Sequence, residues 1–173
     1  MKKQIEPIYS INMTVRDDTD FLSPYSPTDE PVVSGEVAEF LENGAAKFLP
    51  KQKIELNVYS GCIDDGEKIV YENAIRNFFN LKLSGTELSL KRNLIVSVVF
   101  TVIGIVGLVA MLLFDKFFDN AIWTEIVDIF AWVFVWEAVD QFFIERRKIL
   151  RDRRKYKAFT EIRINYHPVK NKD

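Results

Sequence analysis

The chain has 173 residues, of which 48% are hydrophobic and 28% charged, and its formal net charge is -2 at pH 7. One cysteine and one histidine exclude an intrachain disulfide and a zinc site built only from Cys and His, because such a site needs about four ligands. The small net charge hides an asymmetry: residues 1–92 carry 11 basic and 15 acidic side chains, whereas residues 145–173 carry 11 basic and 4 acidic ones. Partners must therefore be inferred from local charge.

A strand, a loop and a helix are predicted in the N-terminal part. Apolar Ile11, Met13 and Val15 alternate with polar neighbours, which predicts a strand with one buried face. The segment 16–31 holds three of the six prolines and shows no apolar period, so we expect an irregular connection over the surface. After it, Ser34 is the expected N-cap of a short helix.

The same pattern of strand and helix then repeats. Alternating apolar residues over 54–58 predict a second strand. Apolar residues at helical spacing predict a helix from Asp64 or Asp65 to about Leu81. Thr86 resembles a new helix start, and no helix breaker follows it for more than 25 residues. We therefore expect a further helix that begins in the cytoplasm and continues into the apolar run that follows.

The run Leu94–Phe114 is the strongest signal in the chain. It comprises 21 residues with neither charge nor proline. A helix rises about 1.5 Å per residue, so a run of this length crosses about 30 Å of hydrocarbon. The sequence therefore predicts an integral membrane protein.

A second apolar stretch, Ala121–Ile144, follows after a connection of six residues. Such a connection is short enough for a turn between antiparallel helices, which predicts a transmembrane hairpin with spans at about 94–114 and 121–144. Unlike the first span, the second carries acidic residues. They are Glu125, Asp128, Glu137 and Asp140.

Basic residues predict the orientation of this hairpin. Lys91 and Arg92 precede the first span, eight basic residues lie within 146–157, and the turn holds only Lys116. Cytoplasmic loops carry an excess of Lys and Arg, so both termini are expected in the cytoplasm. The chain is thus predicted to be a multi-pass protein of the cell membrane with its turn outside.

A third strand is predicted after the hairpin, where apolar and polar residues alternate over 162–166. Three strands and two helices predict the fold class: an α+β membrane protein with a two-helix transmembrane hairpin inserted into a small cytoplasmic α/β domain. Pairing of the last strand with another subunit is the alternative. The expected division is 1–92 for the first part of the cytoplasmic domain, 93–144 for the hairpin, and 145–173 for a basic juxtamembrane helix and the completing strand.

The acids of the second span are the first candidates for a functional site. At about 100° per residue, several of them share one stripe of the helix with two tryptophans. The candidate intramembrane polar site comprises Glu125, Asp128, Trp132, Trp136 and Asp140, with Glu137 off the edge of the stripe. One interpretation is a cation or proton path, because acids inside a membrane are costly and usually face protein or water. The favoured interpretation places Glu125 at the outer headgroups and pairs Glu137 and Asp140 with basic residues at the inner boundary.

Small residues mark one face of the first span. Ser97, Thr101 and Gly104 share this face, and Gly107 lies nearby. Small side chains let two helices approach closely. We expect them to pack within the hairpin or between subunits, against bulky partners such as the tryptophans of the second span, rather than to form a binding site.

The basic run after the second span is expected to attract anionic lipid headgroups, each charge contributing about 1 kcal/mol near such a surface. The candidate lipid contacts are Arg146, Arg147, Lys148, Arg151, Arg153, Arg154 and Lys155. The second helix should continue through this run, with Lys148 and Asp152 four residues apart on one face. Nucleic-acid binding is the weaker interpretation because no recognised DNA or RNA motif accompanies the run.

Acidic residues before the first span form no recognised catalytic motif. Asp17, Asp18 and Asp20 offer oxygen ligands for a divalent cation, but their spacing is not that of an EF-hand, so a solvated loop is favoured. Asp64 and Asp65 precede a glycine and indicate a turn and helix cap.

Other chemistry-bearing residues are equally unspecific. Ser60, Cys62 and His167 match no established arrangement for a nucleophile. The sequence contains no Walker loop, no dinucleotide-binding glycine pattern and no HExxH motif. No cofactor and no metal are therefore expected.

The leading functional hypothesis is a non-enzymatic, two-span membrane protein whose cytoplasmic domain binds a protein partner or forms a homo-oligomer. The alternative is an oligomeric ion-conducting or membrane-perturbing effector that uses the acids of the second span. A weaker alternative is a membrane-bound enzyme acting on lipid or nucleotide, which requires a cytoplasmic pocket that gathers Asp17, Asp18, Asp64 and Asp65.

Overall fold

The computed structural model describes residues 8–48, 53–117 and 121–169. The chain divides into two compact units. The first comprises Met1–Gly85 and Asp152–Asp173, and the second comprises Thr86–Arg151. Two helices contribute residues to both units: α2 (Asp65–Phe117) and α4 (Arg146–Thr160).

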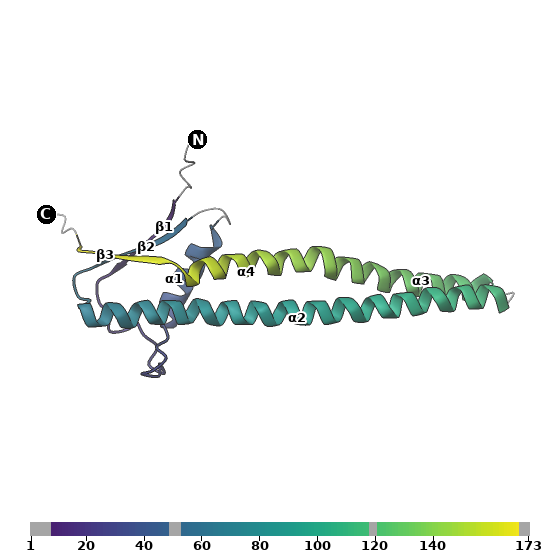
Figure 1. The fold of residues 1–173 in the computed structure, drawn as a ribbon, viewed down its shortest axis with the longest axis horizontal. Coiled ribbons are helices and arrows are strands. Elements are labelled where there is room, and N and C mark those ends of the chain that lie inside the picture. Colours follow the sequence, from purple (N-terminus) through teal and green to yellow (C-terminus); the bar gives the residue numbers. More distant parts are fainter. Residues whose placement is uncertain (1–7, 49–52, 118–120, 170–173) are drawn as a thin grey trace. The chain divides into compact units, whose positions relative to one another are not determined.

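The first unit contains a three-stranded parallel sheet, as Figure 1 shows. Its elements in chain order are β1 (Ile8–Val15), α1 (Gly35–Ala46), β2 (Lys53–Ser60), the first part of α2, the last part of α4, and β3 (Arg163–His167). The strand order is β1-β2-β3, so β2 is central. Because β3 pairs with β2 of the same chain, with Leu56 opposite Ile164, the intramolecular pairing of the last strand is observed. The mixed α+β class and the three strands are thereby confirmed.

One face of this sheet supports the core. Six inward side chains of β1 and β2 are apolar and at most 8% exposed. They are Ile11, Met13 and Val15 from β1, and Ile54, Leu56 and Val58 from β2. Helices cover this face: Leu41 of α1, Phe79 of α2 and Phe159 of α4 are all fully buried in the same cluster. The alternation in sequence therefore produced one apolar layer between sheet and helices.

The opposite face of the sheet is polar. Asn12, Asn57 and Asn165 occupy one row across the three strands. The Asn57 amide donates to Asn12 Oδ1 over 2.9 Å, and the Asn165 amide donates to Asn57 Oδ1 over 3.2 Å. These hydrogen bonds connect the three strands on the face of the sheet that is opposite the apolar core.

The connection after β1 differs from the expected surface loop. Phe21, in the middle of the loop, is only 3% exposed, and its ring stacks on Tyr71 at 4.2 Å between centroids. Leu22 and Val33 form an isolated antiparallel bridge that closes the loop. A single aromatic side chain without periodic neighbours gave no signal in the sequence, yet it completes the core. Ser34 occupies the predicted N-cap position of α1.

Helix α2 also differs from the prediction of two helices separated near residues 81–86. It is continuous from Asp65 to Phe117. The expected break contains no proline, and a single glycine costs about 1 kcal/mol relative to alanine without ending a helix. A Cβ atom on Gly85 would meet nothing within 4 Å, so the close approach of another segment does not explain this glycine.

The second unit contains α2 from Thr86 onward, α3 (Ala121–Val139), the π-helical turn η1 (Asp140–Glu145) and the start of α4. Asn93 of α2 contacts Gln141, whereas Gly107, further along α2, lies against Ala131, which comes earlier in the chain than Gln141, so the two segments run in opposite directions. The facing pairs are Asn93 with Gln141, Phe100 with Phe134, Gly104 with Val135, and Gly107 with Ala131.

The apolar part of α2 matches the expected first span. Within the described residues, the segment Asp65–Leu113 is long and apolar enough to cross a membrane. Its most apolar window of 18 residues has a mean hydropathy of 2.8 and is 11% buried. The two-span topology and the sides of the termini stay predictions.

Candidate functional site

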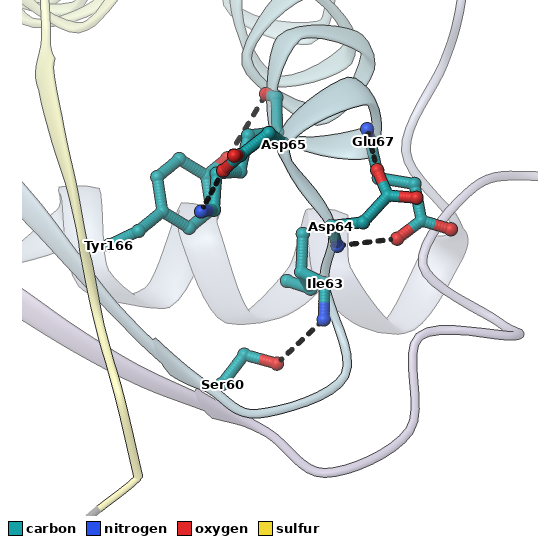
Figure 2. A network of polar contacts seen from close by, with 7 residues as sticks. Ser60, Ile63, Asp64, Asp65, Glu67 and Tyr166 are labelled. Atoms are coloured by element: carbon teal, nitrogen blue, oxygen red, sulfur yellow. Dashed lines mark hydrogen bonds and ion pairs between the residues drawn. The ribbon is translucent and has the colours of Figure 1, made fainter.

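The acids at the start of α2 serve the helix end. Asp64 Oδ1 accepts a hydrogen bond from the Glu67 amide, and Glu67 Oε2 accepts one from the Asp64 amide, both over 2.8 Å (Figure 2). This reciprocal capping satisfies amides that lack partners within the helix. Asp65 pairs with Lys68 over 2.6 Å, and the hydrogen bond to Lys68 lowers the pKa of the Asp65 carboxyl. The predicted cap is thus observed.

The acids after β1 also have local partners. Asp17 Oδ1 accepts hydrogen bonds from the hydroxyl and the amide of Thr19, which lower the pKa of Asp17. Asp18 Oδ2 accepts one from the Tyr71 hydroxyl over 3.0 Å. In the part of the chain that the structure describes, no three His, Cys, Asp or Glu side chains are placed to hold a metal ion. Asp17, Asp18, Asp64 and Asp65 thus each have a hydrogen-bond partner of their own.

The three nucleophile candidates fall into two local arrangements. Ser60 Oγ lies 3.1 Å from Cys62 Sγ and accepts hydrogen bonds from the Cys62 and Ile63 amides. His167 instead stacks on Tyr59, with 5.1 Å between ring centroids. These contacts describe a turn after β2 and a pair of rings on the polar face of the sheet.

The second unit holds a polar network around a buried asparagine. Asn93 is only 6% exposed, and its amide donates to the backbone carbonyl and to Oε1 of Gln141 over 3.1 and 3.0 Å. Gln141 in turn donates to Glu137 Oε1 over 2.9 Å. Hydrogen bonds therefore join three side chains, from Asn93 on α2 to Gln141 and then to Glu137 on the opposite helical segment.

The π-helical turn creates part of this network. The Arg146 amide donates to the carbonyl of Gln141, five residues earlier, and Asn93 donates to the same carbonyl. A π-helical turn inserted in an α-helix is uncommon and often marks a functional site. Gln141 and Glu145 both lie within this turn.

A groove of about 410 Å³ adjoins the network. Its lining residues are Ser89, Arg92, Asn93, Val96, Gln141, Glu145 and Ile149, all within the second unit. Glu145 pairs with Lys148 over 2.9 Å, and this hydrogen bond raises the pKa of Lys148. We call this feature the Arg92 groove. Its lining combines one arginine, one glutamate, three uncharged polar side chains and two aliphatic ones.

The sequence-predicted stripe lies at the surface of the second unit. Trp132 and Trp136 are 59% and 69% exposed, and Glu125 is exposed as well. Asp128, Glu137 and Asp140 are half-buried. The small face of α2 packs against the second apolar stretch, but its partners are not the tryptophans: Gly104 faces Val135, and Gly107 faces Ala131. Packing between subunits stays a prediction. The two helices approach closely at this point, because a Cβ atom on Gly104 would lie 2.8 Å from Val135 Cγ2. Only small side chains fit between them.

The basic residues that are candidate lipid contacts lie on α4, the helix that follows η1. Arg147, Lys148, Arg151, Arg153 and Arg154 are exposed, whereas Arg146 and Lys155 are half-buried. The guanidinium of Arg146 lies 5.4 Å from the centroid of the Phe142 ring. The ion pairs are spaced by three residues, Lys148 with Glu145 and Lys155 with Asp152, rather than joining Lys148 to Asp152. Most of these cations thus remain accessible to an anionic surface.

The sequence interpretation missed Asn93, Gln141 and the Arg92 groove. Asn93 directly precedes the apolar run, and Gln141 lies at a similar distance beyond the turn, so folding one stretch onto the other would have brought both amides together. No family model matches this chain, and neither a curated protein nor a solved structure resembles it significantly.

Proposed function

We propose that this chain is a non-enzymatic, two-span protein of the cell membrane that self-associates and carries a cytoplasmic α+β domain for oligomerisation or partner binding. The observation that carries the proposal is the outward stripe formed by Glu125, Asp128, Trp132 and Trp136. In a lone α2/α3 pair inside a bilayer, this stripe would face lipid.

The membrane placement has two supports. The apolar window of α2 is 11% buried, whereas the core helix of a soluble protein is mostly buried. Basic residues flank both predicted spans on one side, which favours cytoplasmic termini. A reporter fused after Asp173 should be active in the cytoplasm, and activity only outside it would contradict this topology.

Self-association follows from the cost of acids in hydrocarbon. A charged group near the centre of a bilayer costs about 2.5–3.5 kcal/mol or more, so acids in spans face protein or water. Asp128 is half-buried and has exposed Trp132 beside it. A second copy that covers the stripe would remove the acid from lipid and pack the tryptophan rings.

The cytoplasmic domain offers a second contact. Within the described residues, β1 and β3 are the outer strands of the sheet, and each pairs on one side only. An open strand edge presents amides and carbonyls that another chain can pair with. This geometry supports partner binding or oligomerisation by the domain.

The test is the number of full-length chains per particle, counted by single-molecule photobleaching in lipid vesicles at low protein density. We expect oligomers for the native chain and a shift toward monomers for the double variant Trp132→Leu, Trp136→Leu. The control is Phe130→Leu, because Phe130 is also 63% exposed but lies off the stripe. Native chains that bleach in single steps would overturn the proposal.

Ion conduction is the second candidate function, and the same acidic stripe supports it. Two helices cannot enclose a pore, so conduction requires the proposed oligomer. Proton or cation flux into vesicles that falls in Asp128→Asn and Asp140→Asn would favour it. Flux at the level of empty vesicles would leave an oligomer without a conducting role.

A further inference from the structure

We propose that the Arg92 groove binds the phosphate headgroup of an anionic glycerophospholipid in the cytoplasmic leaflet. This inference rests on the membrane placement proposed above, and it concerns a site distinct from the acidic stripe. Its basis is the combination of location, charge and mixed lining in one groove of the second unit.

The location of the groove matches the headgroup layer. Arg92 and Asn93 directly precede the uncharged run that begins at Leu94. On the opposite segment, Gln141 and Glu145 lie at the end of the second apolar stretch. If the apolar runs lie in hydrocarbon, the groove opens where lipid phosphates are found.

The lining suits an amphiphilic anion. Arg92 provides a guanidinium, whose planar donors match phosphate oxygens. Ser89 and Asn93 add polar groups, whereas Val96, which lies inside the apolar run, adds aliphatic surface for the first acyl carbons. A volume of about 410 Å³ falls within the range of about 300–1,000 Å³ typical of small-ligand sites.

The local charge balance favours a phosphodiester over a cation. The one carboxylate in the lining, that of Glu145, already pairs with Lys148 over 2.9 Å. Because that carboxylate is neutralised by Lys148 from outside the lining, Arg92 supplies the positive charge that a phosphate in the groove would meet. The buried Asn93 donates to the Gln141 carbonyl within the π-helical turn and so holds this turn beside the groove.

The adjacent residues Lys91 and Arg92 provide a matched pair for the test. Both are exposed cations at the same membrane boundary, but only Arg92 lines the groove. General attraction of one charge to an anionic surface changes affinity about fivefold. A specific phosphate site should lose more than that when its arginine is removed.

The experiment is native mass spectrometry of the full-length chain in detergent, titrated with phosphatidylglycerol or with phosphatidylcholine. We expect the native chain to retain one phosphatidylglycerol per chain in preference to phosphatidylcholine. Arg92→Gln should weaken this retention at least tenfold, whereas Lys91→Gln should weaken it no more than about fivefold. Circular dichroism must show unchanged helix content in both variants.

Three results would overturn the proposal. Equal losses in the two variants would indicate diffuse attraction, and equal retention of the two lipids would exclude recognition of the anionic headgroup. Displacement of phosphatidylglycerol by millimolar inorganic phosphate would assign the groove to a free anion. The same spectra give the number of chains per particle, so failure of lipid binding is distinguishable from failure of self-association.

Discussion

The two units of the chain distribute polar and apolar side chains in opposite ways. In the first unit, Leu41, Phe79 and Phe159 are fully buried, and a row of asparagines crosses the polar face of the sheet. In the second unit, apolar residues cover the surface, while Asn93 and Ser97 are 6% and 3% exposed. Each arrangement is favourable in a different solvent, because water rewards apolar burial whereas hydrocarbon penalises exposed polar groups.

The strongest test of this contrast compares two phenylalanines. Phe79→Ala in the first unit should lower the free energy of unfolding by about 3–5 kcal/mol, because it empties a fully buried position. Phe130→Ala, at a side chain that is 63% exposed in the second unit, should change it by about 0.5 kcal/mol or less. Thermal and denaturant unfolding of the full chain in detergent measure both. Equal effects would contradict the assignment of the two surfaces.

A polar group buried in the first unit should show in the pH dependence of stability. Burial, and next the hydrogen bond to Asp18, raise the pKa of Tyr71 above its ordinary value of 10.0. The stabilisation by the protonated hydroxyl is full below pH 10 and decreases as the pH rises further, because the unfolded chain then ionises first. At pH 8, Tyr71→Phe should cost about 1.5–3 kcal/mol, as expected for a hydrogen bond to a carboxylate.

Unfolding of the native chain and of Tyr71→Phe, followed from pH 8 to 11, checks this expectation. The difference between the two should shrink above pH 10. A constant difference over the whole range would show that the Tyr71 hydroxyl is not protected from ionisation in the folded state.

Close packing in the second unit should be sensitive to volume at one face of α2. Gly104→Leu should destabilise the α2/α3 pair by about 1–3 kcal/mol, since even a Cβ there would lie 2.8 Å from Val135 Cγ2. Val106→Leu is the control, because Val106 is 62% exposed. Hydrogen exchange of amides 86–117 reports the change. Protection that falls equally in both variants would mean that Gly104 does not set the approach of the helices.

The smallest expected effect concerns the residue at which the first unit passes into the second along α2. A Cβ on Gly85 meets nothing within 4 Å, so Gly85→Ala should stabilise the helix by up to about 1 kcal/mol. Slower hydrogen exchange of amides near residue 85 is the measurement. Faster exchange would argue that the two helical parts are interrupted there, as the sequence had suggested.

Local patterns explain why much of the first unit could be predicted. Strands at 11–15, 54–58 and 162–166 were visible because alternation with a period of two reports one buried face. The capping role of Asp64 was visible because helix starts have short sequence signals. Phe21 was missed, since a lone aromatic residue in a proline-rich loop has no period to reveal its burial.

Candidate sites were harder to predict because they join distant residues. The acids and tryptophans of the predicted second span were found as a stripe, but their exposure depends on which face of α3 meets α2. The small residues of α2 suggested bulky partners such as the tryptophans, whereas the backbones approach so closely that Val135 and Ala131 lie against Gly104 and Gly107. The expectation overlooked that two closely approaching helices leave room only for small side chains between them.

The amino-acid sequence by itself determined an apolar helix long enough for a membrane, an alternating set of strands and a strongly basic segment after the second apolar stretch, because each depends on neighbours within a few residues. Tertiary structure alone decided that β3 pairs with β2, that Asn93 reaches Gln141 and that Trp132 faces outward. These features depend on how separate faces meet, and contacts between residues about 50 or 100 positions apart leave no local period to read.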